Sequence, residues 1–460
     1  MVFSSLPFLF FYLMTMLLIY KLAPLKLRNL ILLVASLFFY GWGEPVYILI
    51  MFLSIAVDYV HGVLVERWRD NDRKARMAVA SSVFFNLTIL IFFKYWDFIA
   101  SNINALTGLS IPVMGIPLPI GISFYTFQTM SYTIDVYRKD APVQKNIITF
   151  GAFVTLFPQL IAGPIIQYKS VAEQLESRKE DLEKFVSGIR RFCVGMAKKV
   201  LLANAIGQLW DVSLASESLT VTGARLGLIA YAFQIYFDFS GYSDMAIGLG
   251  RMLGFEFIEN FNYPYISRSV VEFWKRWHIS LTTWFREYIY FPLGGNRVPK
   301  WKWIRNILIV WTVTGIWHGA GWNFLLWGLY YGVLMLAERL FLGKYLEKLP
   351  VALRHVYTMV LVLLGWALFA VEDMGRLGAY LRSCFSGTFF DALTAYRLVS
   401  YLPMLVILTV AATPLGKRLW DKLGERTRAI LLPILMTVVL VLCTASLVDA
   451  SYNPFLYFRF

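Results

Sequence analysis

Apolar residues in this chain are grouped into blocks of about 20, the length that an α-helix needs to cross the hydrocarbon core of a bilayer. The blocks lie near residues 6–20, 29–42, 46–65, 77–99, 116–136, 147–166, 186–210, 224–252, 303–317, 320–342, 352–371, 398–415 and 429–448. Only 16% of the 460 residues are charged, against about 25% in soluble domains, which is too few to cover a soluble protein of this length. The pattern predicts an all-α polytopic membrane protein with about 11–13 transmembrane or re-entrant helices.

No linker rich in Pro, Gly or Ser and no internal repeat divides the sequence, so we expect a single membrane domain over residues 1–460. The three cysteines, Cys193, Cys384 and Cys443, lie far apart in apolar surroundings. They give neither a disulfide framework nor the spacing of metal ligands. We therefore expect no metal site and no prosthetic group.

The basic excess, a net charge of +14, is concentrated in short loops between apolar blocks, as at 67–76 and 417–428. Cytoplasmic loops of membrane proteins have this character. The positive charge is therefore first a signal of membrane topology and does not indicate a nucleic-acid partner. We expect both chain ends to lie outside the cytoplasm. Anionic lipid head groups or a phosphorylated donor are the alternative targets of this charge.

Residues 254–305 break the pattern, because they are too charged to span a membrane and too apolar for a free loop. Within 273–290, Trp, Leu and Phe recur near helical spacing with charges between them. This predicts amphipathic helices that lie in, or dip into, the cytoplasmic interface. Lys275, Arg276 and Arg286 in this region could bind donor phosphates, and a plain positive-inside loop explains them about as well.

His318 is the histidine that most suggests chemistry, because residues 311–328 around it carry no formal charge. An imidazole in such a place needs a partner or a wet cavity, and intramembrane ionisable residues are functional candidates. Histidine can accept and return a proton near neutral pH, as acyl transfer to a hydroxyl requires. A histidine that only forms a hydrogen bond to a neighbouring helix explains the residues equally well.

Two further groups of polar residues have both a chemical and a structural interpretation. His278 could orient His318 or shape the donor path, but an interfacial histidine beside cations is the simpler interpretation. Asp238 and Asp244 stand with three hydroxyl residues in an apolar setting, where they could bind a cation, cap a broken helix or hold buried hydrogen bonds. The residues favour structural bonding for this pair.

Four blocks of the sequence resemble the membrane-bound O-acyltransferase family. They read FPQLIAGPI at 157–165, FDFSGYSDMAIGLG at 237–250, FWKRWHISL onward through PLGGNR at 273–297, and GIWHGAGW at 315–322. The ending at 453–460 is also typical of the family. The order and spacing of the blocks most resemble the branch that contains the membrane subunit of alginate O-acetyltransferase, and the similarity extends over essentially the whole chain.

The resemblance implies a fold, a site and a reaction. The helices would form a ring around a central tunnel that joins the two faces of a bacterial plasma (inner) membrane. His318 matches the catalytic histidine of the family and His278 its second histidine, while Lys275, Arg276 and Arg286 would attract the phosphates of acetyl-CoA. The acetyl group would pass to an extracytoplasmic serine-esterase-like partner, and then to an exopolysaccharide or to peptidoglycan. A more distant member, the D-alanyl transferase of teichoic acid, uses a carrier protein as donor.

The expected mechanism is general base catalysis by His318 on an acceptor hydroxyl, with Asn323 or a backbone N–H as a candidate oxyanion donor. The rival interpretation is a transporter or channel in which His318 lines the substrate path and the two aspartates bind a coupling ion. Transporters often contain repeated halves, so the absence of a repeat disfavours this rival. A non-catalytic assembly scaffold is the third possibility.

Overall fold

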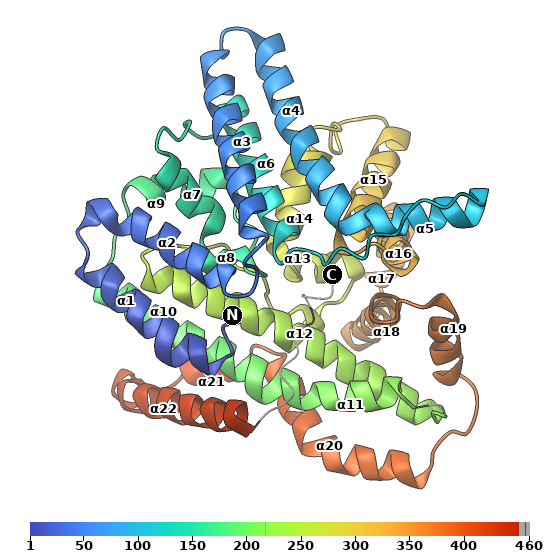
Figure 1. The fold of residues 1–460 in the computed structure, drawn as a ribbon. Helices are drawn as coiled ribbons and strands as arrows, with labels where there is room; N and C mark the ends of the chain where they lie inside the picture. The colour runs from blue at the N-terminus through green and yellow to red at the C-terminus, as the bar shows by residue number, and fades with distance from the viewer. Residues whose placement is uncertain (217, 450–455, 457–460) are drawn as a thin grey trace. The chain divides into compact units, whose positions relative to one another are not determined.

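The computed structural model describes residues 1–216, 218–449 and 456, which form α-helices joined by short loops and by 3₁₀ or π turns (Figure 1). No strand occurs in this described part of the chain, and the expected all-α polytopic architecture is confirmed. Of the expected family motif at 453–460, all residues except Leu456 lie outside the described residues.

The chain divides into two compact units. Unit 1 comprises Met1–Phe192 and Ser243–Ile258, and unit 2 comprises Cys193–Tyr242 and Glu259–Phe460. Two helices, α10 (Leu182–Met196) and α12 (Val221–Met252), contribute residues to both units. Because these two helices continue from one unit into the other, we propose that residues 1–460 form one domain, as expected from the sequence.

Six helical segments among the described residues are long and apolar enough to cross a membrane. They are Ile48–Arg67, Asp72–Thr107, Trp322–Leu346, Val351–Ala370, Ala392–Ala411 and Glu425–Asp449. Each coincides with a block found in the sequence. The other blocks form helices that are shorter, interrupted or more polar. The block at 147–166, for example, is broken into α7 (Ile147–Thr155) and α8 (Phe157–Leu160), where Pro158 begins a new turn.

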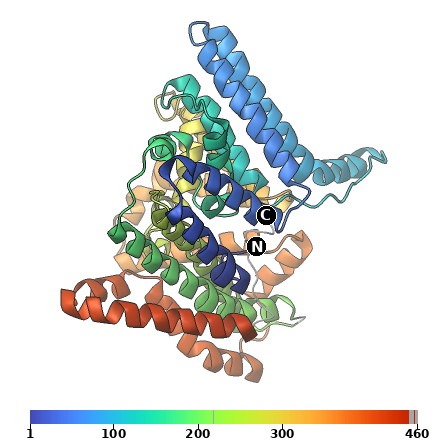
Figure 2. The same ribbon diagram turned by 60° about the vertical axis from the view of Figure 1, so that its left-hand side comes forward.

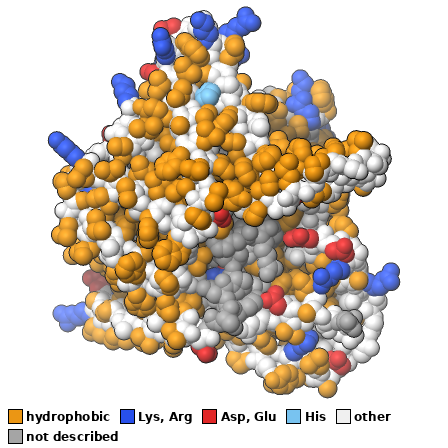
Figure 3. Space-filling model, in the orientation of Figure 1, with side chains coloured by type: hydrophobic (Ala, Val, Ile, Leu, Met, Phe, Trp, Pro, Cys, Tyr) orange, Lys and Arg blue, Asp and Glu red, His pale blue; other side chains and the backbone are white. Residues whose placement is uncertain are grey.

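Unit 1 is built around an antiparallel hairpin of two long helices. Its helices are α1 (Leu13–Leu22), α2 (Arg28–Gly41), α3 (Ile48–Arg67), α4 (Asp72–Leu90), α5 (Trp96–Thr107), α6 (Ile122–Arg138), α7, α8, α9 (Tyr168–Glu176), most of α10 and the end of α12. The hairpin is α3 and α4, which lie side by side in both ribbon views (Figures 1 and 2). Hydrophobic side chains cover its visible flank and Lys and Arg gather at its tip (Figure 3), as expected for a membrane hairpin with a basic loop.

A buried polar cluster fastens this hairpin to α6. Asp58 of α3 accepts hydrogen bonds from the Ser82 hydroxyl at 2.6 Å and from the Asn86 amide at 2.8 Å, both on α4. The Thr129 hydroxyl of α6 donates to Asn86 Oδ1 at 3.1 Å. Since a polar group inside a span is costly unless it is bonded, these contacts define which faces of the three helices meet.

Unit 2 contains the remaining helices. They are α11 (Asn204–Leu214), α12 as far as Tyr242, α13 (Val270–Arg276), α14 (Ile279–Phe285), α15 (Lys300–His318), α16 (Trp322–Ala337), α17 (Gly343–Leu346), α18 (Val351–Ala370), α19 (Met374–Ser383), α20 (Ala392–Ala411), α21 (Leu415–Asp421) and α22 (Glu425–Asp449). The site residues come from the end of the long helix α15 and from the short helices α13 and α14.

The antiparallel pair α15 and α16 crosses at two glycines. A Cβ added to Gly315 would lie 2.4 Å from the Phe324 carbonyl oxygen, and one added to Gly328 would lie 2.3 Å from the Trp311 carbonyl oxygen. Only residues without a side chain let two backbones approach this closely. The crossing lies one turn before His318, and it therefore determines where this histidine sits against α16.

Helices α13 and α14 confirm the amphipathic pattern expected for residues 273–290. Their Trp, Leu and Phe residues are buried, whereas Lys275 and Arg286 are exposed. Trp274 contacts Trp311 of α15 and Tyr331 of α16, with ring centroids 4.7 and 4.9 Å apart. A large aromatic side chain therefore holds α13 against the long helices α15 and α16.

Candidate active site

His318 is the last residue of α15 and lies in an aromatic enclosure. Its ring is 4.8 Å from the Trp327 ring and 5.3 Å from the Phe369 ring, both edge to face, and 4.9 Å from the ring of its neighbour Trp317. The residue is only 4% exposed. The imidazole is thus screened from bulk water by flat, apolar surfaces that also fix its orientation.

His278 lies between α13 and α14 with a left-handed backbone, φ 46°. A residue other than glycine that is held in this conformation stores strain, and such residues cluster at functional sites. The ring is buried and packs edge to face on Phe239 of α12, with 4.7 Å between centroids. It lies outside the six candidate spans, and burial lowers its pKa to about 3, so that it is neutral at physiological pH.

Asn260 orients His278 and was not among the site residues predicted from the sequence. Asn260 Oδ1 lies 3.1 Å from His278 Nδ1 and also accepts from the Ser280 hydroxyl at 2.9 Å. An amide oxygen can only accept, so His278 Nδ1 carries the proton and Nε2 is the basic nitrogen. The sequence offers only a weak signal for Asn260, namely an Asn that follows an apolar helix, because Asn is also common in ordinary loops.

The two histidines predicted from the sequence come together in the fold. Their ring centroids are 6.5 Å apart, although 40 residues separate them in the chain. Trp317 lies beside both rings, with its centroid 6.2 Å from that of His278. Two imidazoles at this distance can act on one small reacting group placed between them, either as two bases or as a base and an orienting donor.

Glu338 supports the segment that leads to His278. Its carboxylate, 6% exposed, accepts hydrogen bonds from the backbone N–H groups of Val270 and Val271 at 2.7 and 2.9 Å. The Ser269 side chain accepts from the backbone N–H of Glu272 at 3.0 Å. These bonds satisfy the first N–H groups of α13, which a helix cannot satisfy by itself, and so fix where α13 begins.

The three basic residues expected at the donor phosphates lie in two different environments. Lys275 and Arg286 are exposed. Arg276 is partly buried, forms an ion pair with Glu272 at 2.9 Å, and donates to the Asn262 carbonyl at 3.1 Å. The guanidinium of Arg276 therefore has its charge balanced by a close carboxylate. Lys275 and Arg286 are more open to solvent, and Arg286 lies 3.9 Å from the Glu287 carboxylate.

The two aspartates of the 237–250 block form ion pairs, in agreement with the structural interpretation favoured from the sequence. In unit 2, Asp238 is buried and lies 2.5 Å from Lys199 Nζ, and its second oxygen accepts from the Leu456 backbone N–H at 2.9 Å. In unit 1, Asp244 lies 2.6 Å from the Arg191 guanidinium. Each carboxylate is therefore held by a cation from the helical segment before α12.

Three other polar residues have structural bonds. Asn323, the candidate oxyanion donor, directs its amide N–H groups at the Leu368 and Phe369 carbonyl oxygens at 3.4 Å, which fastens the start of α16 to the end of α18. His61 has both ring nitrogens in hydrogen bonds, and His355 Nδ1 lies 3.2 Å from the Ser267 carbonyl oxygen. Each of these three residues is therefore held by hydrogen bonds of its own.

The fold and the site together define a multi-pass membrane protein with two buried histidines in an aromatic enclosure. The family model of the membrane-bound O-acyltransferases (MBOAT) matches residues 124–371, which include both histidines. The chain belongs to this family and is an O-acyltransferase. Membership of this enzyme family excludes a transporter or a non-catalytic scaffold as the primary interpretation of the chain.

Similar proteins are named for the acylation of several different polymers. The chain is 39% identical to a probable alginate O-acetylase, AlgI, of Azotobacter vinelandii, over the full length of both proteins. It is 32% identical to a peptidoglycan O-acetyltransferase of Helicobacter pylori, over 75% of this chain and 71% of that protein. It is 29% identical to a teichoic acid D-alanyltransferase of Bacillus subtilis, over 48% of this chain and 59% of that protein.

Proposed function

We propose that this protein transfers an acetyl group from cytoplasmic acetyl-CoA, through the membrane, to an extracytoplasmic polysaccharide or cell-wall polymer. Relatives named for the O-acetylation of alginate and peptidoglycan support an acetyl group and a polymer acceptor. The observation that carries the proposal is the pair of buried imidazoles, 6.5 Å apart, in the segment that the family model matches.

In the proposed reaction, His318 removes the proton of an acceptor hydroxyl as its oxygen attacks the thioester carbonyl. The C–S bond breaks, the thiolate takes up a proton, and the products are an O-acetyl ester and free coenzyme A. His278, oriented by Asn260, offers Nε2 as a second hydrogen-bonding nitrogen beside the reacting group. Trp327 and Phe369 keep bulk water from the thioester, and so limit its hydrolysis.

The donor phosphates are proposed to bind the exposed Lys275 and Arg286, with Arg276 in a supporting position. Exposed cations next to short helices can attract a polyanion at little desolvation cost. Arg276 is the weakest of the three for this role, because its ion pair with Glu272 at 2.9 Å is closer than that of Arg286 with Glu287 at 3.9 Å, and its side chain is less exposed. In this proposal a ring of helices encloses a tunnel through a bacterial inner membrane, and a serine-esterase-like partner receives the acetyl group outside.

The test is acyl transfer by the purified protein with radiolabelled acetyl-CoA and a hydroxyl acceptor, comparing His318→Ala with His355→Ala. His355 is a matched control, because it lies in the same unit and its ring nitrogen bonds a backbone carbonyl outside the site. We expect His318→Ala to abolish transfer while the variant still elutes as a folded protein, and His355→Ala to retain it.

Two results would count against the proposal. Transfer at the native rate by His318→Ala would remove this histidine from the reaction. If the native protein acylates the acceptor from a carrier-protein thioester but not from acetyl-CoA, the enzyme class stands and the proposed donor is wrong.

A further inference from the structure

Helix α15 has two faces with different surroundings. At about 100° per residue, Ile307, Trp311 and His318 fall on one side of the helix, whereas Trp301 and Arg305 are rotated from His318 by roughly 100° and 140° about the helix axis. The first three are buried, with His318 in the site, whereas Trp301 is 63% exposed and Arg305 is also exposed. The helix that carries His318 inward therefore presents a second surface outward.

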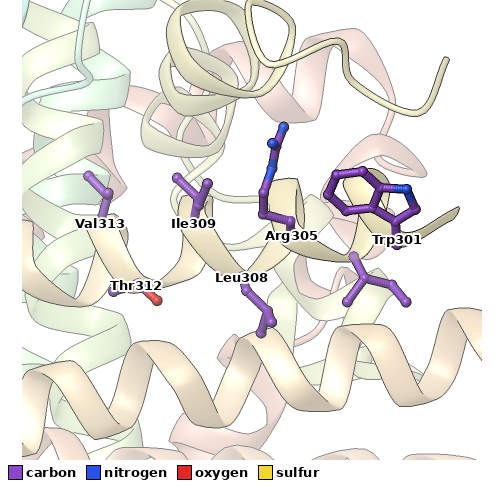
Figure 4. A pocket seen from close by; sticks show the side chains of 7 residues that line it. Trp301, Arg305, Leu308, Ile309, Thr312 and Val313 are labelled. Atoms are coloured by element: carbon purple, nitrogen blue, oxygen red, sulfur yellow. The ribbon is translucent and has the colours of Figure 1, made fainter. Parts of the chain in front are cut away.

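This outward face is hollowed into a groove of about 440 Å³ (Figure 4). The groove is lined by Trp301, Ile304, Arg305, Leu308, Ile309, Thr312 and Val313. Arg305 is the one charged residue in this lining, near one end, and beyond it the lining is apolar except for Thr312. A ligand that fits such a groove has a charged head and a long apolar part.

The charge at the head end is positive. Lys302 Nζ and the Arg305 guanidinium carbon lie 5.4 and 5.9 Å from the centroid of the Trp301 ring. The sequence contains no carboxylate between Glu287 and Glu338, so no local acid in this stretch balances the two cations. The head group that complements them is anionic.

The apolar part of the groove fits within one leaflet of a bilayer. Eight residues separate Arg305, at the head end, from Val313, which is ~12 Å at the α-helical rise. Half of the hydrocarbon core is ~15 Å. An exposed Trp flanked by Lys and Arg is also the usual composition of a helix at the level of the lipid head groups.

We propose that this groove binds an anionic phospholipid, with its phosphate at Arg305 and Lys302 and an acyl chain along Leu308, Ile309 and Val313. The acyl donor is a poorer occupant, because the groove lies on the face turned away from His318. A free phosphate would leave the apolar part of the groove unfilled. The inference depends on the chain being a membrane protein and not on the proposed acetyl transfer.

The test is native mass spectrometry of the purified full-length chain with phosphatidylglycerol or, for comparison, phosphatidylcholine. We expect preferential retention of phosphatidylglycerol, and a decrease in its affinity of about fivefold in Arg305→Gln, from the loss of one cation near a head group. Arg297→Gln is the matched control, since Arg297 is an exposed arginine just before α15 that does not line the groove. It should bind as the native protein does.

Filling the groove tests the apolar half of the proposal. Ile309→Trp places a large side chain in the groove and should prevent retention of the lipid, and Val313→Phe is the alternative if the first variant does not fold. Equal retention of the two lipids, equal losses in the Arg305 and Arg297 variants, or unchanged retention in a folded groove-filling variant would each overturn the proposal.

Discussion

The crossing of α15 and α16 makes a sharp prediction for Gly315→Ala. The new Cβ would lie 2.4 Å from the Phe324 carbonyl oxygen and 3.1 Å from Gly328 Cα, whereas ordinary contacts begin near 3.4 Å. Both obstructing atoms belong to the backbone of α16, which cannot move aside as a flexible side chain can. The two helices must therefore separate by ~1 Å to relieve the contact. Overpacking of this kind costs about 1–3 kcal/mol, which lowers the melting temperature of a chain of 460 residues by ~1–3 °C.

The activity of this variant should fall more than its stability. His318 is three residues beyond Gly315, and its ring packs on Trp327 of the partner helix. A displacement of ~1 Å at a catalytic group can reduce the rate by ~100-fold. The measurements are thermal unfolding in detergent, followed by tryptophan fluorescence, and the rate of acyl transfer at a temperature where the variant is folded.

Gly378→Ala is the matched control for the chemical change. Gly378 lies inside α19, and a Cβ added there would meet no heavy atom within 4 Å. The same substitution should therefore leave activity unchanged and raise stability by about 0.4–1 kcal/mol. The reasoning fails if Gly315→Ala has the melting temperature and the acyl-transfer rate of the native protein. The close crossing of the two helices would then not position His318.

Three further predictions concern buried charges and the bonds around His278. Lys199→Met leaves the Asp238 carboxylate buried without its cation and should lower the free energy of unfolding by roughly 3–5 kcal/mol. The double variant Lys199→Met/Asp238→Asn should recover part of this stability, as measured by thermal unfolding. Because the folded pKa of His278, about 3, lies below its ordinary 6.5, the stability linked to this residue is complete above pH 6.5 and is lost as the pH falls toward 3. The melting temperature of His278→Gln should therefore depend less on pH in this range, and an unchanged slope would contradict the assignment. Glu338→Ala should reduce activity more than Glu338→Gln, which keeps one acceptor oxygen for the two N–H groups of α13, and equal rates in the two variants would argue against a positioning role.

Properties that depend on local sequence were predicted well. The uncharged stretch around His318 and the aromatic pattern of 273–290 are features of neighbouring residues, so the buried helix end and the amphipathic short helices followed from them. Six of the apolar blocks became the six candidate spans. The other blocks were harder to predict, since Pro158 or a run of charges can interrupt a helix that hydropathy alone extends.

The partners within the site could not be predicted, because they come from distant parts of the chain. Asn260 and His278 are 18 residues apart, and Glu338 lies 67 residues beyond the N–H of Val271 that it binds. Neither contact has a periodicity or a motif, and each depends on how the aromatic side chains pack. The same limit explains Asn323, whose amide faces the backbone of α18, a helix that follows it in the sequence.

The bond between Asp238 and the Leu456 backbone has a consequence for biosynthesis. It joins residues 218 positions apart, so the second oxygen of Asp238 has to wait until residue 456 has left the ribosome. Contacts of such long sequence separation form late. A nascent chain that stalls before this point keeps the ion pair with Lys199, but one oxygen of the buried Asp238 carboxylate lacks this hydrogen bond.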